Sequence, residues 1–217
     1  IFDIQDDISQ AVVGTLEVKL VGEKRSLARR YTENVEAYKY YLRGRYYWHK
    51  RTPEAIRKAK ENLELALGED PNYAPAHSGL ADCSVSLALI SDLDPPSKMM
   101  PKAKQAARKA LDLDPTLPEA HASLGFVEVV YDWNWEPADR ELKRAIELNP
   151  GYSTAHYWRA MVVLVGTGRL DEALEEAQAA LNLEPLTPSI NMGLGLVLFY
   201  RCEYEAAAEQ LRKTLEL

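Results

Sequence analysis

Three histidines, His77, His121 and His156, recur at the same place in successive segments and are the first candidates for chemistry. Histidine is a common zinc ligand, so three of them raise the possibility of a metal centre. Zinc needs its ligands about 2 Å from one ion, whereas equivalent positions in stacked helix pairs lie on the order of 10 Å apart. We therefore expect no shared metal. Each ring is expected to pack beside the neighbouring helix, with one nitrogen hydrogen-bonded.

Other motifs that bind ligands or catalyse reactions are incomplete. Gly193-Leu-Gly195 does not follow a predicted strand, so it is not a dinucleotide fingerprint. Asp92 and Asp94 do not make a calcium loop, which needs more oxygen ligands at fixed spacing. No Ser–His–Asp or Cys–His arrangement has a geometric basis. We predict a non-catalytic chain that uses no cofactor and no metal.

Composition restricts the partners. The chain has 217 residues, 47% of them hydrophobic and 27% charged, with a net charge of -7. This is the balance of a soluble globular protein, and its acidity argues against a nucleic-acid surface. No apolar run approaches the roughly 20 residues of a membrane span, and no secretory signal is present. We expect no membrane contact by this segment. Cys83 and Cys202 are predicted in distant helices, which favours buried free thiols over a disulfide.

The chain starts at Ile1 and not at Met, so it is expected to be an excised piece of a larger protein. A cytoplasmic location is predicted. A periplasmic one remains open if a transmembrane helix precedes this piece in the parent.

A repeated four-residue frame organises the elements that must position any functional side chain. It places small or apolar residues at offsets 0, 4 and 7 and a proline at offset 12. The copies are Ala59, Leu63, Ala66, Pro71; Ala103, Ala107, Ala110, Pro115; Ala138, Leu142, Ala145, Pro150; Ala173, Ala177, Ala180, Pro185; and Ala207, Leu211, Thr214. The first three offsets share one face of an α-helix, where small residues let another helix approach. Proline then ends the helix.

A second helix precedes each frame, as in Pro118-Glu-Ala-His-Ala-Ser-Leu-Gly125 and Pro188-Ser-Ile-Asn-Met-Gly-Leu-Gly195. A helix–turn–helix unit with Leu-Gly early, Ala in the middle and Pro at the end resembles the tetratricopeptide repeat (TPR). The resemblance covers about Glu36 to Leu217, with histidine where the family usually has tryptophan near the unit start.

The resemblance implies an all-α fold, a right-handed α-solenoid of about five helix–turn–helix units. The predicted TPR domain is 36–217, with units at about 36–73, 74–117, 118–152, 153–187 and 188–217. Residues 1–31 are predicted to form an amphipathic helix that either caps the stack or binds a partner. Phe2-Asp-Ile-Gln-Asp-Asp-Ile-Ser9 resembles the junction between a TolB-like domain and TPR units in large bacterial signalling proteins. Those proteins carry a DNA-binding, cyclase or kinase domain upstream.

Three places depart from a regular repeat. The turn of the second unit, Ser91 to Pro101, looks about ten residues too long, and its three prolines argue against a continuous helix there. The aromatic and arginine residues of the first helix either fill the core, with solvated arginines, or bind nucleic acid. Trp133 and Trp135 are expected to pack on the neighbouring helix, with a ligand cage as the alternative. The last helix, which ends at Leu217, is expected to leave an apolar flank exposed, or covered by another chain or by sequence not present here.

The resemblance also implies where a ligand would bind, because the first helices of TPR units line an inner groove. The groove positions carried onto this sequence are Tyr41, Arg45, Trp48, Ser78, Asp82, Val85, Ala122, Phe126, Val129, Tyr157, Met161, Leu164, Met192, Leu196 and Phe199. The second half is apolar and suits an amphipathic helix or an extended apolar peptide. It lacks the basic set that clamps a peptide's C-terminal carboxylate in chaperone-binding members. The alternative is a register shifted by one residue, which would place these side chains in the core.

Two functional hypotheses follow. The first is a protein-interaction module of a bacterial regulator that binds a protein or peptide in the groove. The second is a self-association or regulatory module, with a homodimer as its candidate form, that controls an upstream domain.

Overall fold

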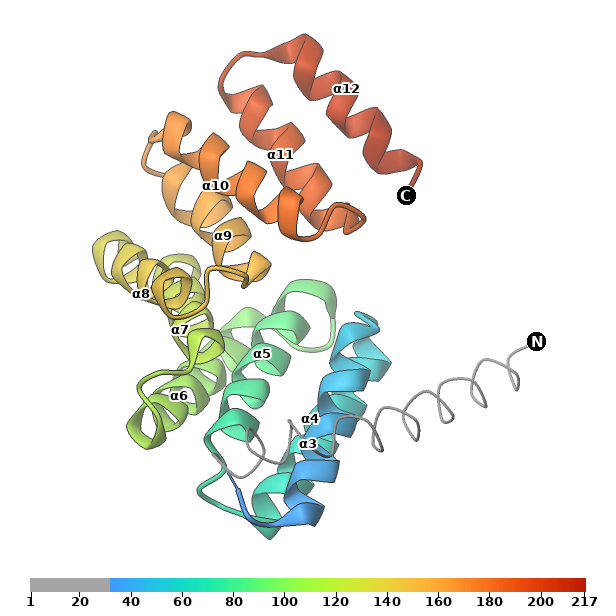
Figure 1. Ribbon diagram of the computed structural model, residues 1–217, viewed down its shortest axis with the longest axis vertical. Coiled ribbons are helices and arrows are strands. Elements are labelled where there is room, and N and C mark those ends of the chain that lie inside the picture. The colour runs from blue at the N-terminus through green and yellow to red at the C-terminus, as the bar shows by residue number, and fades with distance from the viewer. Residues whose placement is uncertain (1–31) are drawn as a thin grey trace, which may run out of the picture.

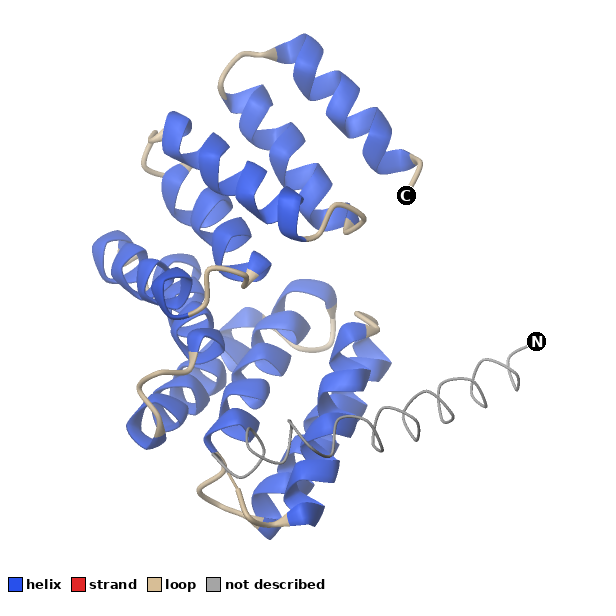
Figure 2. Ribbon diagram, viewed as in Figure 1, coloured by secondary structure: helices blue, strands red, loops and turns tan. Residues whose placement is uncertain are grey.

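The computed structural model describes residues 32–217, and the helix expected within 1–31 lies outside this range. The described residues form helices joined by short loops (Figure 2). The helices of residues 32–217 are α3 (Val35–His49), α4 (Pro53–Glu69), α5 (Ala74–Ile90), α6 (Pro96–Leu113), α7 (Pro118–Val130), α8 (Trp135–Leu148), α9 (Ser153–Trp158), the π-helical segment η1 (Arg159–Leu164), α10 (Leu170–Leu183), α11 (Pro188–Tyr200) and α12 (Tyr204–Leu215).

The helices pack as successive pairs. Contacts join α3 with α4, α5 with α6, α7 with α8, α9–η1 with α10, and α11 with α12, and each pair also packs on the next one. The resulting stack curves into an open arc, with α3 to α5 in one arm and α11 and α12 in the other (Figure 1). This arrangement is the α-solenoid that the repeats predict.

The repeated frame is the buried face of every second helix, as predicted. Ala59, Ala103, Ala138 and Ala173 have no exposed surface, and Ala207 is 2% exposed. Each proline of the frame comes directly after the C-cap residue of its helix. These C-cap residues are Asp70, Asp114, Asn149 and Glu184. Proline lacks the N–H that a further turn would need, so each helix stops at the same place.

Glycine in the first helices allows the two helices of a pair to approach. A methyl group on Gly44, Gly125 or Gly195 would lie 2.7 to 2.8 Å from the Leu side chain at offset 4 of the facing frame. Such a distance is well inside van der Waals contact. The early glycine of the repeat is therefore a close-packing position and not a turn residue.

The second unit differs from the prediction. The connection covers only 91–95, because α6 already begins at Pro96 and continues through Pro101. Pro96 is at the helix start, where a missing N–H costs nothing. Met99 and Met100 in these first turns are 3% and 1% exposed, and this burial offsets the bond that Pro101 cannot make. The predicted break in the helix is therefore present at 91–95, but the expectation of a turn that extends to Pro101 was wrong for this reason.

Four of the five turns inside the pairs share a left-handed backbone residue that the sequence did not reveal; the turn 91–95 of the second unit has none. Its φ is 55° at Arg51, 60° at Trp133, 73° at Gly168 and 65° at Cys202. Glycine adopts this conformation without strain, while the other three residues do so at a cost. Cys202 is also exposed, which corrects the expectation of two buried thiols; Cys83 is buried.

Candidate partner-binding groove

The structure divides the fifteen predicted groove positions into three groups. Met192 and Phe199 are exposed, with 43% and 52% of their surface accessible. The partly buried positions are Tyr41, Arg45, Tyr157, Met161 and Leu196. The buried positions are Trp48, Ser78, Asp82, Val85, Ala122, Phe126, Val129 and Leu164. These eight side chains lie in the core, as the alternative interpretation expected. Only the exposed and the partly buried positions present surface to a ligand.

The C-terminal half of the groove is apolar. Met192, Leu196 and Phe199 lie at i, i+4 and i+7 of α11, which places them on one helix face. The ring of Tyr157 lies against Gly193, where an added methyl group would be 2.6 Å from Cε2 of the ring. Burial raises the pKa of Tyr157. This surface offers aromatic and thioether groups on a fixed helical support.

The buried Phe126 supports this surface from below. Its ring centroid is 4.7 Å from that of Trp158, and both residues belong to the large apolar core of the later units. Leu164 has no exposed surface, while Phe199, one repeat of 35 residues later, is half exposed. The difference arises because a following unit covers Leu164 and, within the described residues, none covers Phe199.

The N-terminal half of the groove is polar. Arg45 of α3 donates to Asp82 of α5 at 2.7 Å, and Ser123 of α7 donates to the other oxygen of Asp82 at 2.6 Å. Burial opposes the charge of Arg45, but the Asp82 carboxylate outweighs this effect and raises the pKa of Arg45. Arg45 is therefore not a solvated arginine, as one interpretation of the first helix expected. It ties the first units together.

Aromatic groups fill the space around this pair. Trp48 donates from Nε1 to Ser86 at 3.1 Å, and the Arg45 guanidinium lies 4.5 Å from the Trp48 ring centroid. The Tyr41 and Tyr73 rings meet edge to face at 5.2 Å, and burial raises the pKa of Tyr41 to about 12. The core interpretation of the aromatic residues of the first helix is thus correct for Trp48 and Tyr41, which pack in the core around Tyr73.

The histidines hold the turns between units. Nε2 of His77, His121 and His156 lies 3.0 Å from the carbonyl oxygen of Pro71, Pro115 and Pro150 respectively. In the last unit Asn191 takes the same role and donates to the Pro185 carbonyl at 2.8 Å. The sequence showed this signal as a polar residue six positions after each frame proline. The expected hydrogen bond of one ring nitrogen is present in all three histidines, and two of them form a second one.

The second ring nitrogen also has a partner in two units. Nδ1 of His121 lies 2.6 Å from Glu141, and Nδ1 of His156 lies 2.5 Å from Glu176. Both carboxylates come from the second helix of the same unit, 20 residues later. In the residues that the structure describes, no group of three or more His, Cys, Asp or Glu side chains is placed to hold a metal ion.

A buried ionic cluster lies beside His156 and was not anticipated from the sequence. Arg159 donates to Asp139 at 2.8 Å and also pairs with Glu176. Burial tends to raise the pKa of Asp139, but hydrogen bonds from Arg169, Arg159 and Lys143 lower it to about 2. This cluster joins the third and fourth units.

The tryptophans at the turn of the third unit behave differently from each other. Trp135 lies on Gly166 of the next unit, as expected for packing on a neighbour. Trp133 is 72% exposed, so the same expectation was wrong for it. The Trp133 ring lies edge to face with the Trp135 ring, with their centroids 6.4 Å apart.

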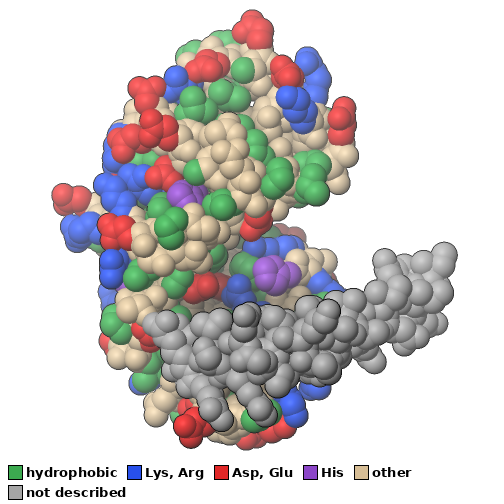
Figure 3. Space-filling model, viewed as in Figure 1, with side chains coloured by type: hydrophobic (Ala, Val, Ile, Leu, Met, Phe, Trp, Pro, Cys, Tyr) green, Lys and Arg blue, Asp and Glu red, His purple; other side chains and the backbone are tan. Residues whose placement is uncertain are grey.

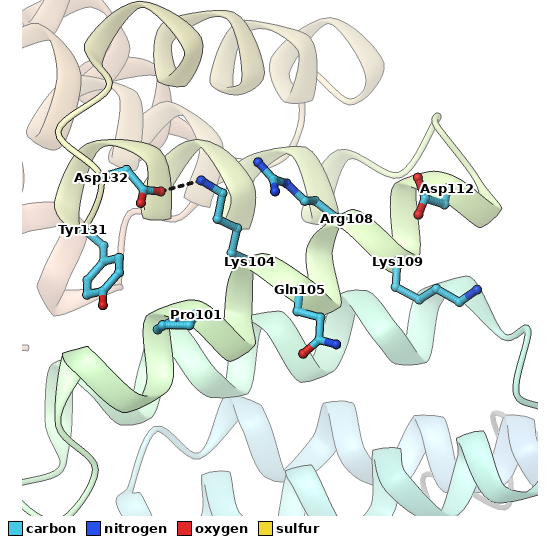
Figure 4. A pocket seen from close by; sticks show the side chains of 8 residues that line it. All are labelled: Pro101, Lys104, Gln105, Arg108, Lys109, Asp112, Tyr131 and Asp132. Atoms are coloured by element: carbon cyan, nitrogen blue, oxygen red, sulfur yellow. Dashed lines mark hydrogen bonds and ion pairs between the residues drawn. The ribbon is translucent and has the colours of Figure 1, made fainter.

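A shallow depression of about 550 Å³ lies outside the groove, along α6 and the end of α7 (Figure 4). Lys104 dominates it and pairs with Glu128 at 2.8 Å and Asp132 at 2.6 Å. Its central cation is therefore already neutralised by protein carboxylates.

Comparisons with known proteins agree with the repeat architecture. A family model described as tetratricopeptide repeat matches residues 134–181 and 162–217. The chain is 29% identical over 145 residues to the transcriptional regulator HilA of Salmonella typhimurium, covering 67% of this chain and 26% of that protein. The chain thus spans about a quarter of the length of the curated relatives it matches.

Solved structures resemble the fold. The crystal structure of TTC0263, a thermophilic TPR protein of Thermus thermophilus, is 23% identical with a TM-score of 0.66, covering 83% of this chain and 90% of that chain. PilF of Pseudomonas aeruginosa is 23% identical with a TM-score of 0.59, covering 82% of this chain and 76% of that chain. No helix in residues 32–217 is long and apolar enough to cross a membrane. The described part of the chain is an α-solenoid with the fold of these TPR structures, and residues 134–217 match the tetratricopeptide-repeat model.

Proposed function

We propose that this chain is a non-catalytic protein-interaction module that binds a peptide or helix of a partner protein in its concave groove. The observation that carries the proposal is the exposed apolar face of α11. Met192 and Phe199 are 43% and 52% exposed, and the half-buried Leu196 lies between them. An exposed apolar face on a fixed support is typical of a helix-in-groove or extended-peptide site.

The support of this face favours recognition by a preformed shape. The glycine at Gly193 lets Tyr157 and Met161 of the preceding unit lie close against α11. Binding to a preformed surface loses less conformational entropy than binding to a mobile one. Methionine adapts to partner side chains of different shape. The proposed ligand is therefore an amphipathic helix or an apolar extended segment.

The test is capture of partners from a bacterial lysate by the wild type and by a Met192→Asp/Phe199→Asp variant. Both side chains are exposed, so the charges should enter water without disturbing the core. Leu93→Asp, at an 81% exposed position in the loop after α5, is the matched control. We expect the groove variant to lose partners that the control retains, with unchanged helical circular dichroism. Equal capture by all three proteins would refute the groove.

We further propose that the module belongs to a larger bacterial regulator. The likeness to a transcriptional regulator about two and a half times longer supports this proposal, and so does the junction-like segment at residues 2–9. In such a parent the module would follow a TolB-like domain and link a partner's presence to a DNA-binding, cyclase or kinase domain.

A second candidate function is self-association, favoured by the end face of the last pair. This end face consists of Phe199, Tyr204 and Leu215, with 52%, 54% and 88% of their surfaces exposed. The residues at the repeat positions of Phe199 and Leu215 in the fourth unit, Leu164 and Leu181, are buried and half-buried. A second copy of the chain would restore that cover.

A further inference from the structure

The concavity contains a cation whose charge the described residues leave without an ion pair. The Arg51 guanidinium lies 3.6 Å from the centroid of the Trp48 ring. No carboxylate of the residues described is within 4.0 Å of it. Asp82 is occupied by Arg45 and Ser123. The aromatic face attracts the cation but does not neutralise it.

Arg51 keeps its position at a conformational cost. Its φ of 55° lies in the left-handed region, and the corresponding turn of the fourth unit has Gly168 there, with φ 73°. An arginine in this conformation, stacked on a buried tryptophan, is held in one orientation before any ligand arrives. Strained residues of this kind are frequent at binding sites.

Arg51 lies where the two arms of the arc face each other. Partial burial lowers the pKa of Arg51, and the charges of Asp82 in the second unit and Glu184 before α11 act in the opposite direction. Glu184 is itself bonded to Ser153 at 2.5 Å and Thr187 at 2.9 Å, so its carboxylate is already committed. Figure 3 shows basic and histidine side chains deep in the concavity.

We propose that Arg51, seated on Trp48, binds a side-chain carboxylate of the partner peptide whose apolar residues contact α11. This inference rests on the proposed function. The site is a single cation on an aromatic platform, unlike the basic set that clamps a C-terminal carboxylate. Glu184, whose charge acts on Arg51, begins the loop that leads into α11, so the acidic residue is expected at one end of the bound segment and the apolar residues at the other. A guanidinium and a carboxylate form charge-assisted hydrogen bonds.

The experiment is selection from a random 12-residue peptide library on immobilised wild type, Arg51→Gln and Arg43→Gln. Arg43 is the matched control, because it is an exposed arginine of α3 that lies 6.0 Å from the Tyr40 ring and is not a groove position. Wild type and Arg43→Gln should enrich peptides with an Asp or Glu beside apolar residues. Arg51→Gln should keep the apolar preference and lose the acidic one.

A selected peptide and its twin with Gln in place of Glu then show how much the acidic side chain contributes to the binding affinity. We expect the twin to bind wild type roughly tenfold or more weakly, as charged hydrogen bonds do. The two peptides should bind the Arg51→Gln variant with nearly equal affinity. Enrichment of apolar residues without acids would overturn the carboxylate site and leave the groove intact. Enrichment of no peptide on any of the three proteins would overturn the groove and this inference together.

Discussion

His156 and Glu176 form a pair whose titration should appear in the stability of the whole protein. The hydrogen bond that His156 donates to Glu176 raises the pKa of His156, against the effect of burial. Burial tends to raise the pKa of Glu176, but the bond to His156 and the charge of Arg159 lower it. The histidine contribution is complete below its unfolded pKa of about 6.5 and is lost as pH rises through the folded value. The glutamate contribution is complete above its unfolded pKa and is lost as pH falls through the lowered one.

Stability from this pair is therefore greatest between about pH 4.5 and 6.5. We expect urea unfolding to show a lower free energy at pH 8.5 than at pH 6.0, with a difference on the order of 1 kcal/mol from this pair. A His156→Asn/Glu176→Gln variant should reduce the difference, because neither amide titrates. Asn191, which donates to the carbonyl of Pro185 at the equivalent position, shows that asparagine can keep the hydrogen bond of the turn. An unchanged pH dependence in the variant would contradict the assignment.

Cys202 tests the strain at the turns. Its φ of 65° favours glycine, which the fourth unit has at the equivalent position, Gly168. Cys202→Gly should therefore raise the free energy of unfolding by about 1 kcal/mol. Cys202→Ala removes the same sulfur and keeps the strain, so it should not. If both variants gain equally in thermal unfolding, loss of the thiol and not relief of strain is the cause.

At the scale of the helix pair, two glycines make opposite predictions. A methyl group on Gly125 would lie 2.8 Å from Leu142 Cγ and 3.1 Å from the Ala138 carbonyl oxygen, while one on Gly68 would meet nothing within 4 Å. Gly125→Ala should lower the free energy of unfolding by about 1–3 kcal/mol through overpacking. Gly68→Ala should raise it by about 0.5–1 kcal/mol through helix propensity. Urea denaturation measures both, and a loss of similar size at the two sites would contradict the close-packing role.

Elements with a strong local signal were predictable. The alanine frame identified the buried face of the second helices, and the frame prolines identified where those helices stop. The continuation of α6 through Pro101 was not predictable, because burial of Met99 and Met100 outweighs a local preference. The left-handed turns at Arg51 and Cys202 were equally hidden, since neither residue type signals that conformation.

The groove was only partly predictable, because the burial of a side chain depends on its neighbours in space. The repeat register placed Met192 and Phe199 on one face correctly, yet the same register includes Phe126, which the next unit covers. Arg51 lies outside the groove positions of the family pattern, in a turn. Its proximity to Trp48 depends on the backbone conformation of that turn.

For the molecule as a whole, the end face makes self-association measurable. Sedimentation over a range of protein concentrations should show a rise in mass for the wild type. Leu215→Glu should abolish that rise, because it places a charge at an 88% exposed apolar position of the end face. Leu93→Glu, at an 81% exposed position away from it, is the control. A monomer at every concentration would exclude the second candidate function.

The stack joins each pair of helices chiefly to the pairs beside it. Tension applied to the two ends of the described segment would therefore act on every interface between neighbouring pairs. Within residues 32–217, the last helix, α12, packs on α11 and contacts no later pair. It should detach first, at the lowest force, and the remaining units should follow in steps, each releasing a length of chain set by one repeat.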